Sequence, residues 1–499
     1  MTNKDETQKE LIRRYFGLWA GIIVLCVMLF FKAPEGLTYK AWVAAAIGLL
    51  MAIWWVFESI PIAATALVPL VLAPMLGVSN LKTVAAPYSE PTVYLFMGGF
   101  IIAVAMEKWG LHKRLALSII KLSGVRPAAL VAGFMAATAF LSMWISNTAT
   151  ATMMLPIALS VISLINDGKD EGKPNNFAIA LLLSIAFSAS IGGLATLVGT
   201  PPNALFAGFM SQHYNIQIGF GQWMMIGLPI SIIMLFITWF FLTQISFPLK
   251  NIDLSGAENI VKKEIASLGK MSNGEARVAI IFTLTAVTWI FSSQLKKMYP
   301  EMNISDAGIA IAAALLLFLT PSGMGKGINL MDWDTAKKIP WGVLVLVGGG
   351  LSLGNIITSS GLSDAIAGAL TSLDKVPVFA LISIISVVVM VVSHLTSNTA
   401  TAAAFLPLVA GIALVLGQNP MLLAIPTVIA ASCVFMMPVA TPPNAIVFAS
   451  GMITVPQMVR AGFLINILAL VLTVVVAYTM LGTAFGVVFG VVPDWALAK

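Results

Sequence analysis

Long apolar runs constrain the fold of this chain more than any other feature of its sequence. Eleven such runs approach the length of about 20 residues with which a helix crosses a hydrocarbon core of about 30 Å. Of the 499 residues, 59% are hydrophobic and only 10% are charged. We therefore expect an all-α polytopic membrane protein with about 11 transmembrane helices. The predicted spans are residues 15–31, 41–57, 60–77, 92–107, 177–208, 222–245, 276–293, 306–320, 341–357, 421–450 and 457–487.

Two further apolar stretches, about residues 127–163 and 376–416, carry polar motifs near their middles. The motifs are ISNTATATMMLP, which starts at Ile145, and TSNTATAAAFLP, which starts at Thr396. Each stretch is long enough for two short helices and awkward for one straight span. We predict that both are re-entrant helical hairpins, which enter and leave the membrane on the same side.

The basic residues give this topology an orientation. With two hairpins and a cytoplasmic N-terminus, most of the 27 Lys and Arg residues fall in cytoplasmic segments, as the positive-inside rule requires. A polar cytoplasmic tail, residues 1–14, then precedes an extra first helix at 15–31, which lacks a convincing cleavage site and is expected to be retained. The expected location is the plasma membrane, a bacterial inner membrane. Orientation in the lipid bilayer explains the modest basic excess, so no nucleic-acid partner is expected.

The sequence contains an internal duplication. Adding 251 to a residue number carries Ser142 onto Ser393 and the SNTAT of the first hairpin onto that of the second. VGTPPNALFAG, from Val198, matches VATPPNAIVFAS, from Val439, at an offset of 241. A missed repeat would misassign the whole fold, so the duplication defines the predicted domains.

We predict a first repeat at residues 41–248 and a second at 276–488, joined by a cytoplasmic linker at 249–275. Each repeat contains five predicted spans and one hairpin. Because five is odd, the second repeat is expected to be inverted in the membrane relative to the first, as in many secondary transporters.

Thr-Pro-Pro-Asn, at Thr200 and again at Thr441, is expected to break its helix, because prolines remove backbone donors and crowd the preceding turn. Irregular backbone at membrane depth survives only where protein or a water-filled cavity surrounds it. Its free carbonyls and nearby hydroxyls suit hard cations, and helix N-termini suit anions. The motifs contain no Asp, Glu, Lys or Arg. Ligands that are neutral oxygens indicate Na⁺. If the bound cations help to hold an anionic substrate, binding of the anion depends on binding of the cations.

The same residues allow two other interpretations. A single Ser-Asn-Thr is usually a hydrogen-bonded packing contact between membrane helices, but two copies, each followed by Thr-Pro-Pro, favour an ion and substrate site. An intramembrane hydrolase needs a serine activated by a histidine. His394, beside Ser393, is the only candidate, and its repeat counterpart is Met143. We therefore expect a satisfied or spectator histidine, and no enzyme.

At these motifs the chain resembles the divalent anion:sodium symporter family, over essentially its full length. Paired Ser-Asn-Thr motifs followed by Thr-Pro-Pro are that family's signature, and ESIPIAATALVPLVLAPMLG, from Glu58 to Gly77, resembles its upstream segment. The resemblance implies opposed hairpins, scaffold and transport domains, a homodimer and an elevator-type movement.

The resemblance also implies site residues. The first Na⁺ site would use Ser142, Ser146, Asn147 and the carbonyl of Gly199. The second would use Ser393, Thr396, Asn398 and the carbonyl of Ala440. The residues implied for substrate carboxylates are Asn147, Thr148, Thr200, Pro201, Asn398, Thr399, Thr441 and Pro442.

The expected function is secondary active import of C4-dicarboxylates, of the succinate, fumarate and malate class, with Na⁺ as the coupling ion. The alternative is a Na⁺-independent dicarboxylate or tricarboxylate exchanger of the same fold.

Overall fold

A computed structural model describes residues 2–124, 126–166, 176–249, 257–325, 327–369 and 376–497. In these ranges the regular structure is helical, apart from one isolated bridge between Pro321 and Asn329. The prediction of an all-α chain is confirmed. Part of the predicted linker, residues 250–256, lies outside the described residues.

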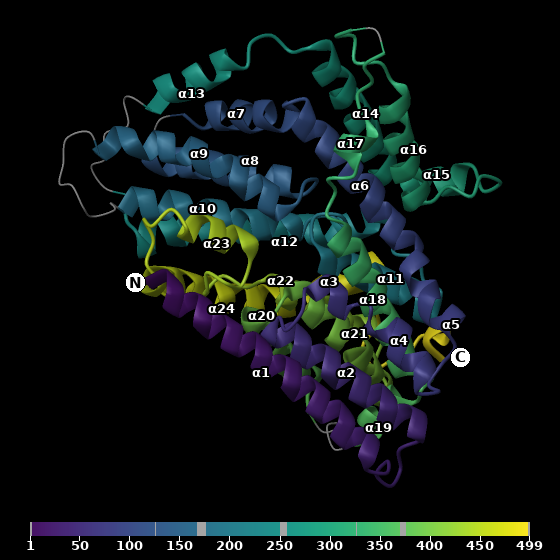
Figure 1. Ribbon diagram of the computed structural model, residues 1–499. Coiled ribbons are helices and arrows are strands. Elements are labelled where there is room, and N and C mark those ends of the chain that lie inside the picture. The colour runs from purple at the N-terminus through teal and green to yellow at the C-terminus, as the bar shows by residue number, and fades with distance from the viewer. Residues whose placement is uncertain are drawn as a thin grey trace.

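The first two helices pack side by side along one edge of the molecule (Figure 1). They are α1, Thr2–Phe30, and α2, Tyr39–Phe57. A Cβ added at Gly21 of α1 would lie 2.6 Å from Nε1 of Trp54 on α2, so glycine permits this close approach. The polar residues predicted as a separate tail continue the same helix as the first apolar run.

The rest of the first half consists of helices of very different lengths. They are α3 (Ile62–Thr65), α4 (Val68–Met75), α5 (Leu81–Ala85), the 3₁₀-helix η1 (Ala86–Ser89), α6 (Pro91–Lys108), α7 (Leu111–Ser123), α8 (Pro127–Ser142), α9 (Asn147–Asn166), α10 (Asn176–Gly193), α11 (Pro201–Tyr214), α12 (Phe220–Phe240) and the π-helix η2 (Phe241–Ser246).

A connecting region follows and leads into the second half. Its helices are α13 (Ala257–Ser267), α14 (Asn273–Ile290), α15 (Ser292–Met298), α16 (Asp306–Leu319) and α17 (Trp333–Ala336). The remaining helices are α18 (Trp341–Ser359), α19 (Leu362–Ala369), α20 (Val378–Leu395), α21 (Asn398–Val415), α22 (Met421–Ser432), α23 (Pro442–Phe448), α24 (Val455–Thr479), α25 (Leu481–Phe485) and α26 (Asp494–Leu497).

The two halves repeat one order of elements. At the offset of 251 residues, the helices α6, α8 and α9 of the first half correspond to α18, α20 and α21 of the second. The pairs α10–α11 and α22–α23 follow them, each interrupted just before Thr-Pro-Pro-Asn. Each predicted hairpin is thus two helices joined at Ser-Asn-Thr. The chain unwinds ahead of the prolines, which occupy the first turn of the next helix, where a missing N–H costs nothing.

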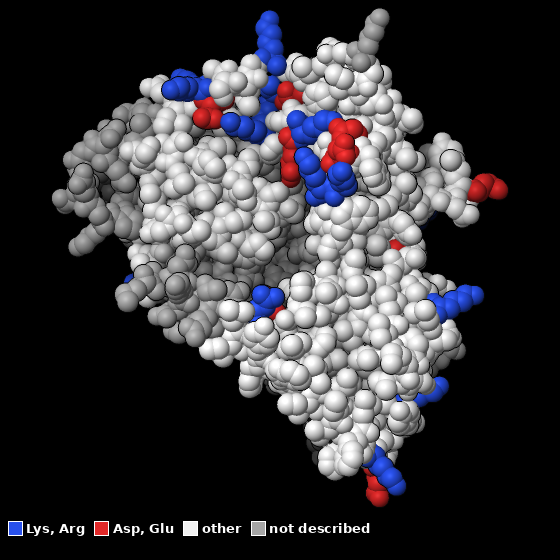
Figure 2. Space-filling model, viewed as in Figure 1, with Lys and Arg blue, Asp and Glu red and all other residues white. Residues whose placement is uncertain are grey.

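Nine helices among the described residues are long and apolar enough to cross a membrane, and the pair α14–α15, bent by 68°, makes up to ten. Two of the nine, α20 and α21, are arms of a predicted hairpin. Three of the predicted spans, 60–77, 306–320 and 421–450, consist of shorter apolar helices. The chain is a multi-pass membrane protein. Figure 2 shows charged side chains gathered along one edge, over α7, α13 and α17, above a face that is largely uncharged.

The core lies around α10, in which every residue from Phe177 to Gly193 is buried. A helix that is apolar all round belongs in the interior of a bundle. Both hairpin arms α8 and α9 pack against α10, and so does α23 from the other half. Reciprocally, α11 of the first half packs against α21 of the second hairpin. The rings of Phe187 and Phe435, 5.2 Å apart, join the halves at the centre.

Candidate functional site: two hairpin tips closed onto broken helices

The first hairpin tip folds onto the break between α10 and α11. The hydroxyl of Ser142, at the end of α8, donates to the carbonyl oxygen of Ala189 at 2.7 Å. The Asn147 amide, with Nδ2 turned inward, donates to Ser142 Oγ, Ala189 O and Gly199 O at 2.5, 3.1 and 3.2 Å. Three of the four residues predicted for the first cation site therefore meet, together with one carbonyl that was not predicted.

Glycine makes this meeting possible. A Cβ at Gly199 would lie 2.5 Å from the carbonyl oxygen of Gly193, and one at Gly193 would lie 2.9 Å from the side-chain amide of Asn147. Asn203 then closes the unwound segment, because its Nδ2 lies 2.8 Å from Thr196 O and 3.3 Å from Gly193 O. The carbonyls freed by the break are thus partly satisfied by side chains of the following helix, as buried backbone groups require.

The second tip repeats the central contact. Ser393 Oγ donates to the carbonyl oxygen of Ala431 at 2.6 Å and lies 3.0 Å from Asn398 Oδ1. Asn444, the counterpart of Asn203, donates from Nδ2 to Met437 O at 3.0 Å. The same three parts, a serine, an asparagine five residues later and a carbonyl of the broken helix, meet at both tips.

The other predicted residues are less closely joined. Ser146 caps α9, because its Oγ accepts from the N–H of Ala149 at 3.2 Å. Thr396 Oγ1 lies 2.6 Å from Thr401 Oγ1 and 3.1 Å from Val392 O, and no hydrogen bond joins it to Ala440 in the described chain. Thr148 and Pro442 are exposed and Pro201 is half-buried, whereas Thr200, Thr399, Thr441 and Ala440 are buried.

Several polar groups close to the candidate site were not predicted from the sequence. The carbonyls of Ala189 and Ala431 have no side-chain signature. Among the described residues, four buried side-chain oxygens lack a hydrogen-bond partner at matching places in the halves: Oγ of Ser190 and Ser432, and Oδ1 of Asn203 and Asn444. Buried polar atoms are normally paired, so matched exceptions near both breaks point to a ligand that completes them. The duplication of the Thr-Pro-Pro-Asn motif was the available signal for the asparagines.

His394 has partners on both ring nitrogens, as expected of a satisfied histidine. Its Nδ1 lies 2.7 Å from Met390 O, so Nδ1–H donates and Nε2 accepts. Nε2 lies 3.4 Å from the N–H nitrogen of Met436 and 3.3 Å from Nδ2 of Asn466. Ser393 directs its hydroxyl to Ala431 instead. No Ser–His pair suited to nucleophilic catalysis is formed here.

A family model described as the sodium:sulfate symporter transmembrane region matches residues 13–485. The chain belongs to this family. Membership confirms the resemblance drawn from the paired motifs, and it places the chain among transporters rather than enzymes.

Relatives extend over nearly the whole chain. The sodium-dependent dicarboxylate transporter SdcS of Staphylococcus saprophyticus is 39% identical over 95% of this chain and 92% of its own length. SdcS of Staphylococcus aureus strain USA300 is 39% identical over 92% of this chain and 89% of its own.

Two solved structures share the fold at low sequence identity. The YdaH transporter of Alcanivorax borkumensis matches with a TM-score of 0.54 at 14% identity, covering 90% of this chain and 99% of its own. MtrF of Neisseria gonorrhoeae matches with a TM-score of 0.55 at 14% identity, covering 91% and 96%. These likenesses bear on architecture alone.

Proposed function

We propose that this chain is a Na⁺-coupled importer of C4-dicarboxylates, of the succinate, fumarate and malate class. The observation that carries the proposal is the repeated closure of a serine and an asparagine onto a backbone carbonyl at both hairpin tips. The names of the relatives, which are sodium-dependent dicarboxylate transporters, support the same ion and substrate class.

A cation at the first tip would replace the amide hydrogens of Asn147, with Oδ1 of that residue turned toward it. Its ligands would be the oxygens of Ser142, Ser146, Asn147 and Gly199, joined by Ala189 O, which lies within the same contacts. At the second tip they would be the oxygens of Ser393, Thr396, Asn398 and Ala440, with Ala431 O in the matching place. Hydroxyl, amide and carbonyl oxygens without a carboxylate suit a hard monovalent cation.

The substrate would lie between the tips. Asn147 and Asn398 are the first residues of α9 and α21, helices of 20 and 18 residues, so N–H groups and the positive end of a helix dipole are available for each carboxylate. Thr148 and Thr399 follow them, and the proposed pocket is closed by Thr200, Pro201, Thr441 and Pro442. Bound cations add the positive charge that the motifs lack, which makes anion binding depend on Na⁺.

We further propose that the repeats are inverted, that hairpins and broken helices move together as a transport domain against a dimerising scaffold, and that the N-terminus faces the cytoplasm of a bacterium. The duplicated order of helices and the basic residues of the predicted cytoplasmic loops support this arrangement.

The test is uptake of labelled succinate into proteoliposomes that contain the purified protein. An inward Na⁺ gradient should drive accumulation into vesicles free of substrate, and replacement of Na⁺ by choline should abolish it. Accumulation that instead requires internal dicarboxylate and ignores Na⁺ would establish the exchanger. A panel of fumarate, malate, citrate and sulfate competitors then defines the preferred anion.

A further inference from the structure

The hydroxyl of Thr196 joins the first hairpin tip to the broken helix. Thr196 lies in the unwound segment between α10 and α11, and its side chain is buried. Its Oγ1 donates to the carbonyl oxygen of Met143 at 2.6 Å and accepts from the N–H of Gly199 at 3.0 Å. Met143 directly follows Ser142, so this hydroxyl connects the two backbone segments that carry Ser142 and Gly199, both proposed as ligands of the first cation.

The two backbone groups that meet this hydroxyl lie outside regular helix. Met143 is the C-cap of α8, where a carbonyl has no acceptor role within the helix, and Gly199 precedes the first residue of α11. Backbone donors and acceptors inside a protein need partners from elsewhere in such places. A single threonine side chain supplies one partner of each kind, and in doing so it links the hairpin to the break.

Gly199 needs this restraint more than another residue would. Glycine has no side chain to limit its backbone, so its carbonyl can turn through a wide range of directions. A larger residue does not fit, because a Cβ at this position would lie 2.5 Å from Gly193 O. The N–H of Gly199 is bonded to Thr196, and its carbonyl oxygen lies 3.2 Å from the Asn147 amide. The direction of this proposed ligand is therefore set by its neighbours, Thr196 among them.

Thr196 is itself held in place by α11. Its carbonyl oxygen accepts from Nδ2 of Asn203, a buried residue near the start of α11, at 2.8 Å. A side chain that is branched at Cβ has few χ1 rotamers, so the direction of the hydroxyl is restricted as well. The hydroxyl thus reaches from a fixed backbone on the α11 side to the hairpin tip on the other.

The described part of the second half shows no equivalent hydroxyl bridge. Residues 433–440, which separate α22 from Thr441, contain neither serine nor threonine. A side chain of the tip makes the junction instead, because Nε2 of His394 accepts from the N–H of Met436 at 3.4 Å. Loss of the Thr196 hydroxyl should therefore affect the first of the two proposed cation sites and leave the second intact.

We propose that Thr196 is a positioning residue of the first cation site. Its hydroxyl fixes Gly199 against the hairpin tip, so that Gly199 O and the oxygens of Ser142 and Asn147 face one ion together. Thr196 acts through these ligands, because its own hydroxyl is directed to the backbone of Met143 and Gly199. The inference rests on the proposed function for the place of the first cation, and it adds a residue from the unwound segment to the determinants of Na⁺ affinity.

The test is Thr196→Val, in which a methyl group takes the place of the hydroxyl at nearly constant shape. The Na⁺ concentration for half-maximal succinate uptake into proteoliposomes should rise about tenfold, as when a group that orients a metal ligand is removed. At saturating Na⁺ the succinate KM should stay close to that of wild type. Thr196→Ser, which keeps the hydroxyl, should restore most of the Na⁺ affinity. If Thr196→Val does not fold, Thr196→Cys carries the same expectation, because a thiol is a weak donor and acceptor.

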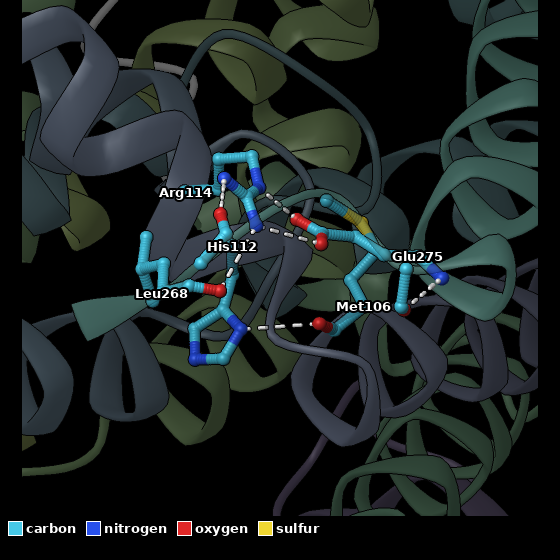
Figure 3. A network of polar contacts seen from close by, with 7 residues as sticks. Met106, His112, Arg114, Leu268 and Glu275 are labelled. Carbon is cyan, nitrogen blue, oxygen red and sulfur yellow. Dashed lines mark hydrogen bonds and ion pairs between the residues drawn. The ribbon is translucent and has the colours of Figure 1, made fainter. Parts of the chain in front are cut away.

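Two controls separate positioning from a general loss of stability. Thr138→Val removes a buried hydroxyl whose bond, to Phe134 O at 2.7 Å, stays within α8. Arg114→Met removes contacts outside the tip: Figure 3 shows Arg114 turned toward the carboxylate of Glu275 and the carbonyl of Leu268. Arg114→Met should lower the unfolding temperature, and both controls should keep the Na⁺ dependence of wild type.

Thermal unfolding without substrate measures cation binding apart from transport. The detergent-solubilised protein is compared in NaCl and in choline chloride at equal ionic strength. The stabilisation by Na⁺ should shrink in Thr196→Val and return in Thr196→Ser. Unchanged Na⁺ stabilisation and an unchanged Na⁺ curve in Thr196→Val overturn the inference, and so does an equal shift of the Na⁺ curve in Arg114→Met.

The same measurements distinguish failure of the inference from failure of the proposed function. If wild type shows Na⁺-driven uptake and Thr196→Val has the same Na⁺ curve and Na⁺ stabilisation, the inference alone fails. If wild type shows no Na⁺-driven uptake but is stabilised by Na⁺, and Thr196→Val is stabilised less, the proposed function fails and the inference stands. If Na⁺ neither drives uptake nor stabilises wild type, both fail.

Discussion

Asn466 reaches from α24 to His394 on the second hairpin, where its Nδ2 lies 3.3 Å from the imidazole Nε2. The same side chain lies 3.1 Å from Cys433 O through Nδ2, and its Oδ1 accepts from the N–H of Phe435 at 3.2 Å. Both residues therefore hold the unwound segment that follows α22. The polar groups satisfied there belong to the backbone, which identifies the histidine as a structural support beside the tip.

We expect His394→Ala to reduce stability by about 1–3 kcal/mol, because it leaves the N–H of Met436 without its acceptor. Na⁺-dependent uptake per folded molecule should persist. Thermal unfolding and proteoliposome uptake on the same preparation separate these effects. Loss of uptake with unchanged stability would assign the histidine a direct role in transport.

Gly199→Ala should impair the first tip, because the added Cβ would lie 2.5 Å from Gly193 O. The backbone must shift to relieve this contact, and Gly199 O then leaves Asn147. We expect the Na⁺ concentration for half-maximal uptake to rise at least several-fold. The matched control is Ala440→Gly, which removes a Cβ at the corresponding position and should change that concentration little. Equal behaviour of the two variants would contradict this account of the first site.

Asn147→Ala and Asn398→Ala should each abolish transport. Each removes a side chain that meets the paired serine, at 2.5 Å in the first tip and 3.0 Å in the second. Labelled-succinate uptake under a saturating Na⁺ gradient measures the loss, and thermal unfolding confirms that the variant is folded. Full activity in either variant would exclude its hairpin tip from the site.

Ser142→Ala and Ser393→Ala should raise the Na⁺ requirement without abolishing transport at high Na⁺. Each removes a single hydroxyl oxygen from a cluster that retains its amide and carbonyl oxygens. Uptake as a function of Na⁺ at saturating succinate reports the effect. An increase in the succinate KM with an unchanged Na⁺ curve would instead assign these serines to the substrate.

The ion pair between Arg114 and Glu275 joins α7 to the start of α14, and Glu275 is only 4% exposed. Removing one partner leaves a nearly buried charge alone, so Glu275→Gln or Arg114→Met should cost about 3 kcal/mol. The double variant should cost less than the sum, which a double-mutant cycle by thermal unfolding would detect. Lys337→Met, which breaks an exposed pair with Asp334, should have no measurable effect.

Much of this architecture follows from the sequence, for identifiable reasons. Apolar length and the duplicated motifs predicted a helical membrane protein whose hairpins turn at Ser-Asn-Thr. Pro69, in the first turn of α4, explains why the predicted span 60–77 is divided into α3 and α4. Na⁺ coupling, inversion and the division into domains stay predictions.

The finer features of the site were not predictable. A backbone carbonyl such as Ala189 O leaves no trace in residue type, because every residue has one. The Thr150 hydroxyl is unpaired in the described chain, whereas its counterpart Thr401 is paired with Thr396, and the single letter I at position 145 of ISNTAT gives no sign of this difference. The partners of Glu107's neighbours come from residues more than 150 positions away, such as Glu264 and Glu275. Such contacts are fixed by tertiary packing.

The crossed packing of the halves has a consequence for the origin of the chain. α11 packs against α21 of the second hairpin and α23 packs against α9 of the first, so each hairpin contacts a short helix of the other half. A half-length ancestor would have needed two copies to exchange these helices before it could bury either tip. In one polypeptide both sets of contacts are intramolecular, and the two hairpins can differ, as isoleucine at 145 and threonine at 396 do.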